Sequence, residues 1–389
     1  MIKFEDTPID FFTYANGYYR VDKKFYYKKF NALKESIKTK QEISWDFHRT
    51  AFEIAINNKN LNLNLLEHYK IRAQQLRDSY DYLILAYTGG SDSHNILKTF
   101  LNNNIQLDEV WGDFPKSLLE KGGYTLTNST SSTNMAVEWY TIVIPELNEL
   151  SQLYPKIKIH LSDCWENRSL EDYEDTTSVM NIPGNYLLIQ RFRYLQKYVA
   201  NLIEKTGKKV GVIVGIDKPI PYIKEDSYGM IFADKATFFK SDYYNGIYVP
   251  IEYFYWSSTY PDLPVAQAKN LWNYLLQNKD DTLKRLSYYD SLGSIEILDR
   301  NKNFDIPIKK ICYPYWDFSR IQVNKSGVFY NDNYSRFLEK FKSERVYQSF
   351  LSATSNVYKL PSYVFNDGKH AYSDIKWHYC FFELGKLNW

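Results

Sequence analysis

The sequence predicts an α/β protein built on an open parallel sheet with helices on both faces. Strand-like and helix-like segments alternate between residues 82 and 215. The segments 82–87 and 210–215 are short, continuous apolar runs, which are typical of strands buried on both faces. Repeated alternation of strands and helices favours a parallel sheet with helical crossovers.

The alternating part divides the chain into three regions. We expect a helical N-terminal region at 1–77, the α/β domain at 78–225, and an irregular α+β region at 226–389 that packs on the sheet domain. The chain is 44% hydrophobic and 24% charged, as folded proteins are. The first residues include acids and lack a long apolar core, so we expect no signal peptide. No run of ~18 apolar residues occurs, and we expect a soluble, cytoplasmic protein without a membrane partner.

The N-terminal region is expected to hold amphipathic helices. Apolar residues recur at three- and four-residue spacing in 24–37 and in 44–56, and Ser44 is a candidate N-cap for the second segment. The stretch 20–40 interleaves basic and aromatic residues. It is either the solvated face of a helix that buries its aromatic rings or a local contact to nucleic acid. The formal net charge of +2 gives no wider footprint for a polyanion.

The central region follows a strand–helix rhythm. The expected strands are 82–87, 108–111, 156–161 and 210–215, and the expected helices are 93–102, 136–153 and 186–205. Gly207 follows the last of these helices, where a glycine commonly ends a helix in the left-handed conformation.

Beyond about residue 220 the pattern is irregular and rich in aromatic residues. We interpret 247–256 and 327–330 as strands or buried loops, and 264–278 and 334–351 as helices. The stretches 313–320 and 365–378 are candidates to shape an acceptor pocket, with Arg320 available for a carboxylate or phosphate. Aromatic density of this kind is more typical of a core than of a ligand cage.

A glycine-rich turn, TGGSDS at 88–93, follows the first expected strand. In open parallel sheets, ligands bind outside the carboxyl ends of the strands. Thr88 and Ser91 offer hydroxyl groups there. Gly89 and Gly90 allow the backbone to approach an anion, and the following helix offers N–H groups with partial positive charge. The turn therefore predicts a phosphate-binding site.

TGGSDS resembles the SGGxDS pyrophosphate-binding loop of the PP-loop ATP pyrophosphatases, a superfamily that includes asparagine synthetase. The one departure is Thr88 in place of the usual serine, which keeps the hydroxyl group. The Walker loop and the dinucleotide pattern GxGxxG are both absent. The resemblance covers roughly residues 80–220. It implies a HUP-like nucleotide-binding domain that holds ATP through the loop residues Thr88, Gly89, Gly90, Ser91, Asp92 and Ser93.

A second loop, GIDKP at 215–219, follows the strand at 210–215. It stands about where related synthetases place a second nucleotide-contacting loop. The resemblance implies that Gly215 contacts the nucleotide and that Asp217 shares a Mg²⁺ ion with Asp92, since oxygen ligands suit Mg²⁺. Lys218 would neutralise the leaving pyrophosphate. An aspartate after a strand is alternatively an ordinary cap or surface residue.

The resemblance also implies a reaction. Such enzymes use ATP and Mg²⁺ to adenylate an oxygen of an acceptor and release pyrophosphate, and an amine or ammonia then displaces AMP. Asp92, Asp217 and Lys218 would be the catalytic residues. The adenine is expected along the second strand, near Val110 and Asp113, by family geometry alone. Asp113 is equally well explained as a turn residue at the end of a strand.

Several absences narrow the chemistry. Position 2 is Ile2 and not the cysteine of many glutamine-fed amidotransferases, which favours ammonia or an amine. No pair of histidines has metal-binding spacing. His94, just after the glycine turn, either faces a phosphate or packs under the loop. The three cysteines form no CxxC pair, so we interpret them as buried small hydrophobic residues in a reducing compartment: Cys164, Cys312 and Cys380.

Three functions stay open at this point. The leading hypothesis is an AMP-forming C–N ligase that acts on a small-molecule or modified-nucleotide acceptor. The second is a PP-loop enzyme that modifies tRNA or DNA, supported by the basic stretch 20–40. The third is a non-catalytic binder or sensor of an adenine nucleotide. The intact GGSDS argues against the third, because a pure binder has little need for the carboxylate of Asp92.

Overall fold

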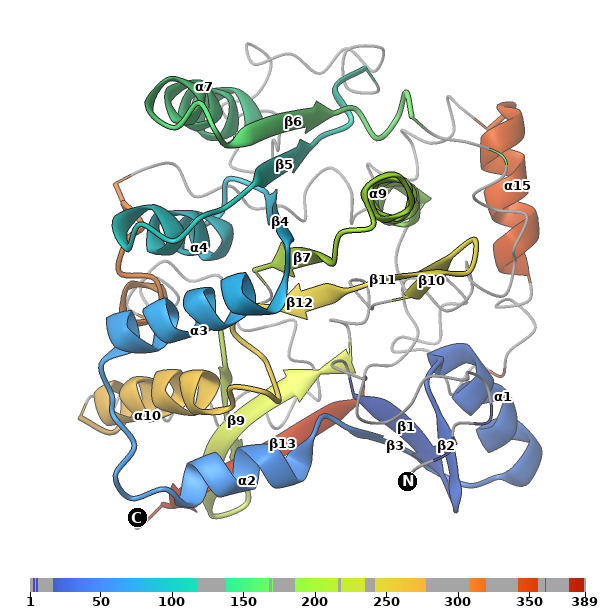
Figure 1. Ribbon diagram of the computed structural model, residues 1–389. Coiled ribbons are helices and arrows are strands. Elements are labelled where there is room, and N and C mark those ends of the chain that lie inside the picture. The colour runs from blue at the N-terminus through green and yellow to red at the C-terminus, as the bar shows by residue number, and fades with distance from the viewer. Residues whose placement is uncertain are drawn as a thin grey trace.

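The structure of the 389-residue chain is a computed structural model (Figure 1). The described strands form a five-stranded sheet, two three-stranded sheets and a two-stranded hairpin. The residues that the structure describes are 3, 5, 17–117, 138–167, 170, 186–215, 218–234, 242–277, 308–319, 342–355, 361 and 378–387.

A five-stranded parallel sheet lies at the centre of the described structure. Its strand order is β12–β7–β4–β5–β6, and every neighbouring pair is parallel. The chain moves outward from the central β4 through β5 and β6, then crosses back to place β7 and β12 on the other side of β4. This is the order of a doubly wound sheet, compatible with a Rossmann-like core. The strands are β4 (Tyr82–Tyr87), β5 (Glu109–Asp113), β6 (Lys158–Ser162), β7 (Val210–Val214) and β12 (Ile251–Tyr253).

The apolar runs of the sequence explain the central strands. Every residue of β5 and of β7 is buried, and four of the six residues of β4 are buried. Strands covered by helices on both faces need apolar side chains in both directions, so they read as continuous hydrophobic runs. The predicted parallel sheet is confirmed, and its strand ends shift by only one or two residues.

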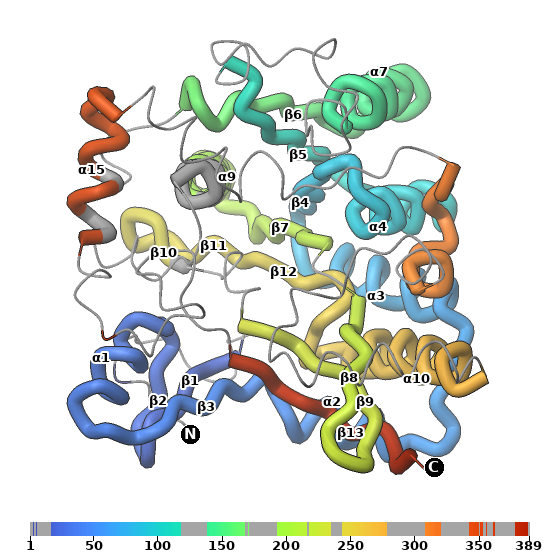
Figure 2. The backbone as a smooth tube through the Cα atoms, turned by 180° about the vertical axis from the view of Figure 1, so that it is seen from behind, coloured from blue at the N-terminus to red at the C-terminus, as the bar shows by residue number. Residues whose placement is uncertain are grey.

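Helices cover both faces of this sheet. α4 (Ser91–Asn102) and α7 (Ile144–Leu153) lie on one face, and α9 (Tyr186–Thr206) lies on the other (Figures 1 and 2). The face changes where the strand order reverses, as right-handed crossovers require. A short π-helical segment, Trp139–Val143, leads into α7. Gly207 follows α9 with a φ of +64°, as predicted.

The N-terminal region contains three strands that the helical pattern did not predict. They form an antiparallel sheet in the order β2–β1–β3. The prediction of Ser44 as an N-cap is wrong, because Ser44 lies within β3 opposite Arg20. The second helix begins at Arg49, after His48 with a φ of +51°. The elements are β1 (Tyr18–Val21), β2 (Lys24–Tyr26), α1 (Lys29–Thr39), β3 (Ile43–Asp46), α2 (Arg49–Asn57) and α3 (Leu65–Ser79).

A third sheet joins the last strand of the chain to its middle. β13 (Tyr379–Lys386) pairs with β9 (Ser227–Ala233), and β9 pairs with β8 (Ile220–Lys224), all antiparallel. Figure 2 shows β13 beside the N-terminal sheet, where the Cys380 thiol donates to the carbonyl of Trp45 at 2.9 Å. The two terminal parts of the described chain therefore pack against each other.

The basic stretch 20–40 is partly buried within this contact. Lys29 is only 4% exposed, and its Nζ lies 2.8 Å from Oδ2 of Asp234, which is fully buried. Tyr19 donates its hydroxyl to the same oxygen at 3.0 Å, and the backbone N–H of His378 donates to Oδ1 at 2.9 Å. The interpretation of 20–40 as a solvated face is therefore wrong at Lys29, which joins α1 to the ends of β9 and β13.

The remaining elements lie after β9. β10 (Asp242–Tyr244) and β11 (Ile247–Val249) form the hairpin, and β11 with β12 confirms strands within 247–256. α10 (Asp262–Gln277) confirms the helix predicted at 264–278. α15 (Arg345–Thr354) overlaps the end of the helix predicted at 334–351 and extends three residues beyond it. Predictions for 327–330, for 334–341 and for 365–377 lie outside the described residues. Within the described part of the chain, no helix is long and apolar enough to span a bilayer.

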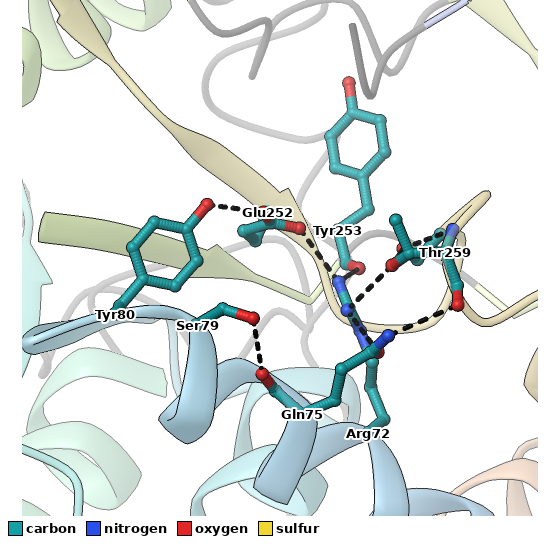
Figure 3. Close-up of polar contacts among 8 residues, drawn as sticks. Arg72, Gln75, Ser79, Tyr80, Glu252, Tyr253 and Thr259 are labelled. Atoms are coloured by element: carbon teal, nitrogen blue, oxygen red, sulfur yellow. Dashed lines mark hydrogen bonds and ion pairs between the residues drawn. The ribbon is translucent and has the colours of Figure 1, made fainter. Parts of the chain in front are cut away.

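A buried ion pair docks α3 on β12 (Figure 3). Arg72 is 2% exposed; its Nη2 lies 2.9 Å from Oε2 of Glu252 and donates to the carbonyl of Tyr253 at 2.9 Å. Tyr80 donates its hydroxyl to the other oxygen of Glu252 at 2.6 Å, and Arg72 Nη1 donates to Gln75 at 2.8 Å. The buried guanidinium is thus balanced by a carboxylate.

Candidate functional site

The glycine turn lies at the carboxyl end of the central strand. β4 ends at Tyr87 and α4 begins at Ser91, so three residues connect them. Gly89 has a φ of +76°, and a Cβ atom there would lie 2.5 Å from Cγ2 of Val143. Both the left-handed backbone and the close neighbour require glycine at this position.

Hydrogen bonds within the turn fix its shape. The hydroxyl of Ser93 accepts from the backbone N–H of Thr88 at 3.2 Å and donates to the carbonyl of Gly90 at 3.2 Å. The hydroxyl oxygen of Thr88 lies 3.3 Å from Oγ of Ser93. Ser93 is 1% exposed. Its side chain therefore holds the loop from inside, and only its backbone N–H is left for the ligand contact predicted from the sequence.

The loop presents backbone donors. Among the described residues, no hydrogen bond uses the backbone N–H of Gly89, Gly90 or Ser91 as its donor. The first N–H groups of a helix have no intrahelical acceptor and carry partial positive charge. N–H groups at the start of a helix can bind an anion without any side-chain cation.

The end of β7 meets the first turn of α4. A Cβ atom on Gly215 would lie 3.1 Å from the backbone nitrogen of Ser93 and 3.2 Å from the carbonyl carbon of Asp92. β4 and β7 are neighbours in the sheet, but the chain reaches β7 only after β5 and β6. The strand order reverses at this edge, which is where doubly wound folds bind ligands. The structure thus brings Gly215, the first residue of the second predicted loop, against the turn at 88–93.

Residues from later in the chain support the first turn of α4. Tyr255 donates its hydroxyl to the carbonyl of Asp92 at 2.8 Å and accepts from the amide of Asn95 at 3.2 Å. The oxygen of the same amide accepts from the backbone N–H of Tyr315 at 3.4 Å. Burial raises the pKa of Tyr255, so its hydroxyl keeps its proton and remains a donor. The predicted acceptor stretch 313–320 therefore reaches this site.

His94 packs under the loop. It is 3% exposed, its Nδ1 lies 3.1 Å from the hydroxyl of Tyr87, and its ring meets that of Trp316 edge to face at 5.1 Å. Of the two interpretations of His94, the structure supports packing. Arg320, the cation proposed for the same stretch as Trp316, lies outside the described residues.

The structure places the second loop only in part. Lys218 contacts the segment 308–319, because its backbone N–H donates to the hydroxyl of Tyr313 at 2.9 Å. The ring of Tyr313 packs edge to face on Tyr255 at 5.5 Å, which links Lys218 to the support of Asp92. Asp217 lies outside the described residues, so the predicted Asp92–Asp217 metal pair stays a prediction.

The two residues predicted near the adenine lie in different surroundings. Asp113 is the last residue of β5, at the carboxyl edge, and accepts from the hydroxyl of Ser162 at 2.8 Å. Val110 is the second residue of β5 and is fully buried between Leu85 of β4 and Ile159 of β6. The structure does not bring Val110 to the edge of the sheet, because β5 has a neighbour on both sides.

The cysteines were predicted to be buried, and no histidine-based metal site was expected. All three cysteines are buried, with exposures of 2%, 0% and 0% for Cys164, Cys312 and Cys380, as predicted. Burial raises the pKa of Cys380 to about 12, which keeps its thiol unreactive. Within the described ranges, no three of the His, Cys, Asp and Glu side chains are grouped as metal ligands would be.

Sequence reasoning missed the tyrosine support of the loop. Asn95 is the one member with a local signal, since a fully buried amide stands on the apolar face of α4. Tyr255 and Tyr313 are ordinary aromatic residues in an aromatic-rich chain, and only the fold brings them to α4. No known family model, curated protein or solved structure matches the chain.

Proposed function

We propose that the protein is an ATP-dependent, AMP-forming synthetase of the PP-loop class. It would adenylate an oxygen of an acceptor, release pyrophosphate and let an amine or ammonia displace AMP. One observation carries the proposal: TGGSDS and Gly215 meet at the point where the strand order of the parallel sheet reverses. That position and the free backbone donors of Gly89, Gly90 and Ser91 suit a polyphosphate.

The described residues would divide the work between binding and charge stabilisation. The N–H groups of the loop would hold the β- and γ-phosphates and stabilise the charge that grows as pyrophosphate leaves. Asp92, half-buried on the first turn of α4, would hold Mg²⁺ together with Asp217. Magnesium, when bound, screens the phosphate charge. Lys218 would add a positive charge beside the pyrophosphate, and Asp113 would lie on the adenine side.

The direct test is pyrophosphate release from ATP with Mg²⁺ and a panel of carboxylic acids and amines. We expect release in wild type, none after removal of Mg²⁺ with EDTA, and a roughly 100-fold loss in Asp92→Asn. The matched control is Asp78→Asn, an exposed aspartate on α3, which should release pyrophosphate at the wild-type rate. Equal activity of Asp92→Asn and wild type would exclude the proposed role of Asp92.

Calorimetry with a non-hydrolysable ATP analogue and with AMP separates the enzyme from a binding module. A synthetase is expected to bind the analogue more tightly with Mg²⁺ than without it. Tight AMP binding that does not depend on Mg²⁺ would instead indicate a nucleotide sensor. Salt-dependent binding of tRNA or DNA that is lost on reversing the exposed charges of 20–40 would assign a nucleic-acid acceptor.

A further inference from the structure

The described structure buries three Lys or Arg side chains, and only two of them have a carboxylate partner. Lys29 pairs with Asp234 at 2.8 Å and Arg72 pairs with Glu252 at 2.9 Å. Arg193 on α9 is 7% exposed, and no carboxylate lies within ion-pair distance of it among the described residues. A guanidinium stays charged at every physiological pH, so Arg193 carries a buried charge without a counter-charge.

The contacts of Arg193 leave donors aimed at no acceptor. Its Nη1 donates to Oε1 of Gln196 at 3.1 Å, and its guanidinium lies 5.0 Å from the ring centre of Tyr244. Arg193 Nε and Gln196 Nε2 are both buried and lack a hydrogen-bond partner within the described part of the chain. Gln196 is fully buried. Two unsatisfied N–H donors beside a buried cation are the features of an anion-binding site.

The comparison with Arg72 shows what Arg193 lacks. The Nε of Arg72 also has no partner among the described residues, so one unsatisfied nitrogen is tolerated. Arg72 nevertheless has the carboxylate of Glu252 on its Nη2 (Figure 3). Among the described residues, a charged acceptor is therefore the difference between the two sites.

Arg193 lies toward the ligand-binding edge of the sheet. α9 runs from the carboxyl end of β6 to the amino end of β7, so its direction opposes that of the strands. Tyr198 contacts Glu109, the first residue of β5, and Arg193 lies five residues nearer the start of α9. At a rise of 1.5 Å per residue, Arg193 stands about 7.5 Å closer to the carboxyl edge. Its guanidinium lies over the ring of Tyr244 in the β10–β11 hairpin. α9 as a whole contacts this hairpin (Figure 1).

We propose that Arg193 and Gln196 bind the carboxylate group of a ligand. Charge balance favours a carboxylate over a phosphate, because one buried cation beside a neutral amide offsets one negative charge, and a phosphate group carries about −1.5 to −2. The planar guanidinium also matches a carboxylate geometrically. We take this ligand to be the acceptor of the synthetase, and that identification rests on the proposed function. The anion site itself does not depend on the proposed function.

The test measures urea unfolding in potassium acetate and in potassium chloride at equal ionic strength. Acetate should raise the urea midpoint of wild type above its value in chloride. This difference should vanish in Arg193→Met and persist in part in Arg193→Lys, which keeps the charge without the planar fork. In chloride, Arg193→Met should unfold at a midpoint equal to or above that of wild type, because it removes an unbalanced charge.

Arg72→Met is the matched control, since it leaves the carboxylate of Glu252 without its cation. It should lower the midpoint in both salts and keep the acetate effect. An equal acetate effect in wild type and Arg193→Met would overturn the proposal. A urea midpoint in chloride that falls as far in Arg193→Met as in Arg72→Met would overturn it too. If potassium phosphate raises the urea midpoint in an Arg193-dependent way and acetate does not, the carboxylate assignment is overturned. An acetate effect without any ATP binding would retain this site and reject the synthetase.

Discussion

Gly89 combines two constraints at one position, a left-handed backbone and a neighbour that leaves no room for a side chain. Its φ is +76°, and an added Cβ would lie 2.5 Å from Val143. Gly207 has a similar φ of +64°, but nothing lies within 4 Å of an added Cβ. A comparison of Gly89 with Gly207 therefore distinguishes the cost of backbone strain from the cost of steric overlap.

We expect Gly89→Ala to lower the free energy of unfolding by about 2–4 kcal/mol, and Gly207→Ala by about 1 kcal/mol, because only the first adds a clash to the strain. Urea unfolding of both variants measures the difference. Equal losses would show that Val143 gives way without cost and that the turn is less tightly held than its geometry indicates.

Asp234 carries a buried charge whose balance sets a pH dependence. Burial alone would raise the pKa of this carboxyl, but the Lys29 ammonium and the His378 hydrogen bonds outweigh burial and lower the pKa from 3.8 to about 2. Burial in turn lowers the pKa of Lys29, opposed by Asp234. Because the folded pKa of Asp234 is depressed, its stabilising contribution is complete above about pH 4 and is lost as the pH falls toward 2.

We expect Asp234→Asn to cost about 3–5 kcal/mol at pH 7, since it leaves Lys29 charged and unbalanced. The difference from wild type should shrink by about 2 kcal/mol between pH 4 and pH 2, as urea unfolding across that range would show. Asp226→Asn, in the exposed pair with Lys386, should change stability little at any pH. A difference for Asp234→Asn that does not vary with pH would contradict the depressed pKa.

At the scale of elements, the contact between α3 and β12 depends on Arg72 and Glu252. Each single replacement, Arg72→Met or Glu252→Gln, removes one partner of a pair that is 2% and 20% exposed. We expect each to cost about 3 kcal/mol, and the double variant to cost less than the sum of the two by at least about 1 kcal/mol. A double-mutant cycle from urea unfolding measures the coupling. Strict additivity would show that the ion pair does not hold α3 in place.

The elements that the sequence pattern predicted well are those with a strong local signal. β4 matches its predicted range of Tyr82–Tyr87, and α9 matches to within a residue, because a buried strand and a long amphipathic helix are visible within one window of sequence. β1, β2 and β3 were missed because three- and four-residue strands show too little alternation. Their pairing depends on contacts across up to 28 residues, from Tyr18 to Asp46.

In the candidate site, too, the residues with a local sequence signal were predicted and the others were not. The turn 88–93 and Gly215 were visible as motifs, and the structure places both at one edge of the sheet. The nucleotide contact of Val110 stays a prediction; the sequence pattern did not show that neighbouring strands cover this residue on both sides. Arg193 was not noticed at all, since an arginine in an amphipathic helix is ordinary until its surroundings are known.

At the scale of the whole molecule, later parts of the chain complete the first turn of α4. Gly215 comes from directly after β7, Tyr255 from directly after β12, and Tyr315 from the segment 308–319. The loop therefore has its shape only in the folded chain. A ligand that binds there is expected to stabilise these segments together, because a ligand that binds only the folded state shifts the unfolding equilibrium by mass action.

The most direct measurement is a crystal structure of the protein with Mg²⁺ and a non-hydrolysable ATP analogue. We predict phosphate oxygens at about 2.7–3.2 Å from the backbone nitrogens of Gly89, Gly90 and Ser91, with the base toward Asp113. Density for the analogue at another site, or an empty loop in crystals grown at a saturating concentration of the analogue, would contradict the role assigned to residues 88–93.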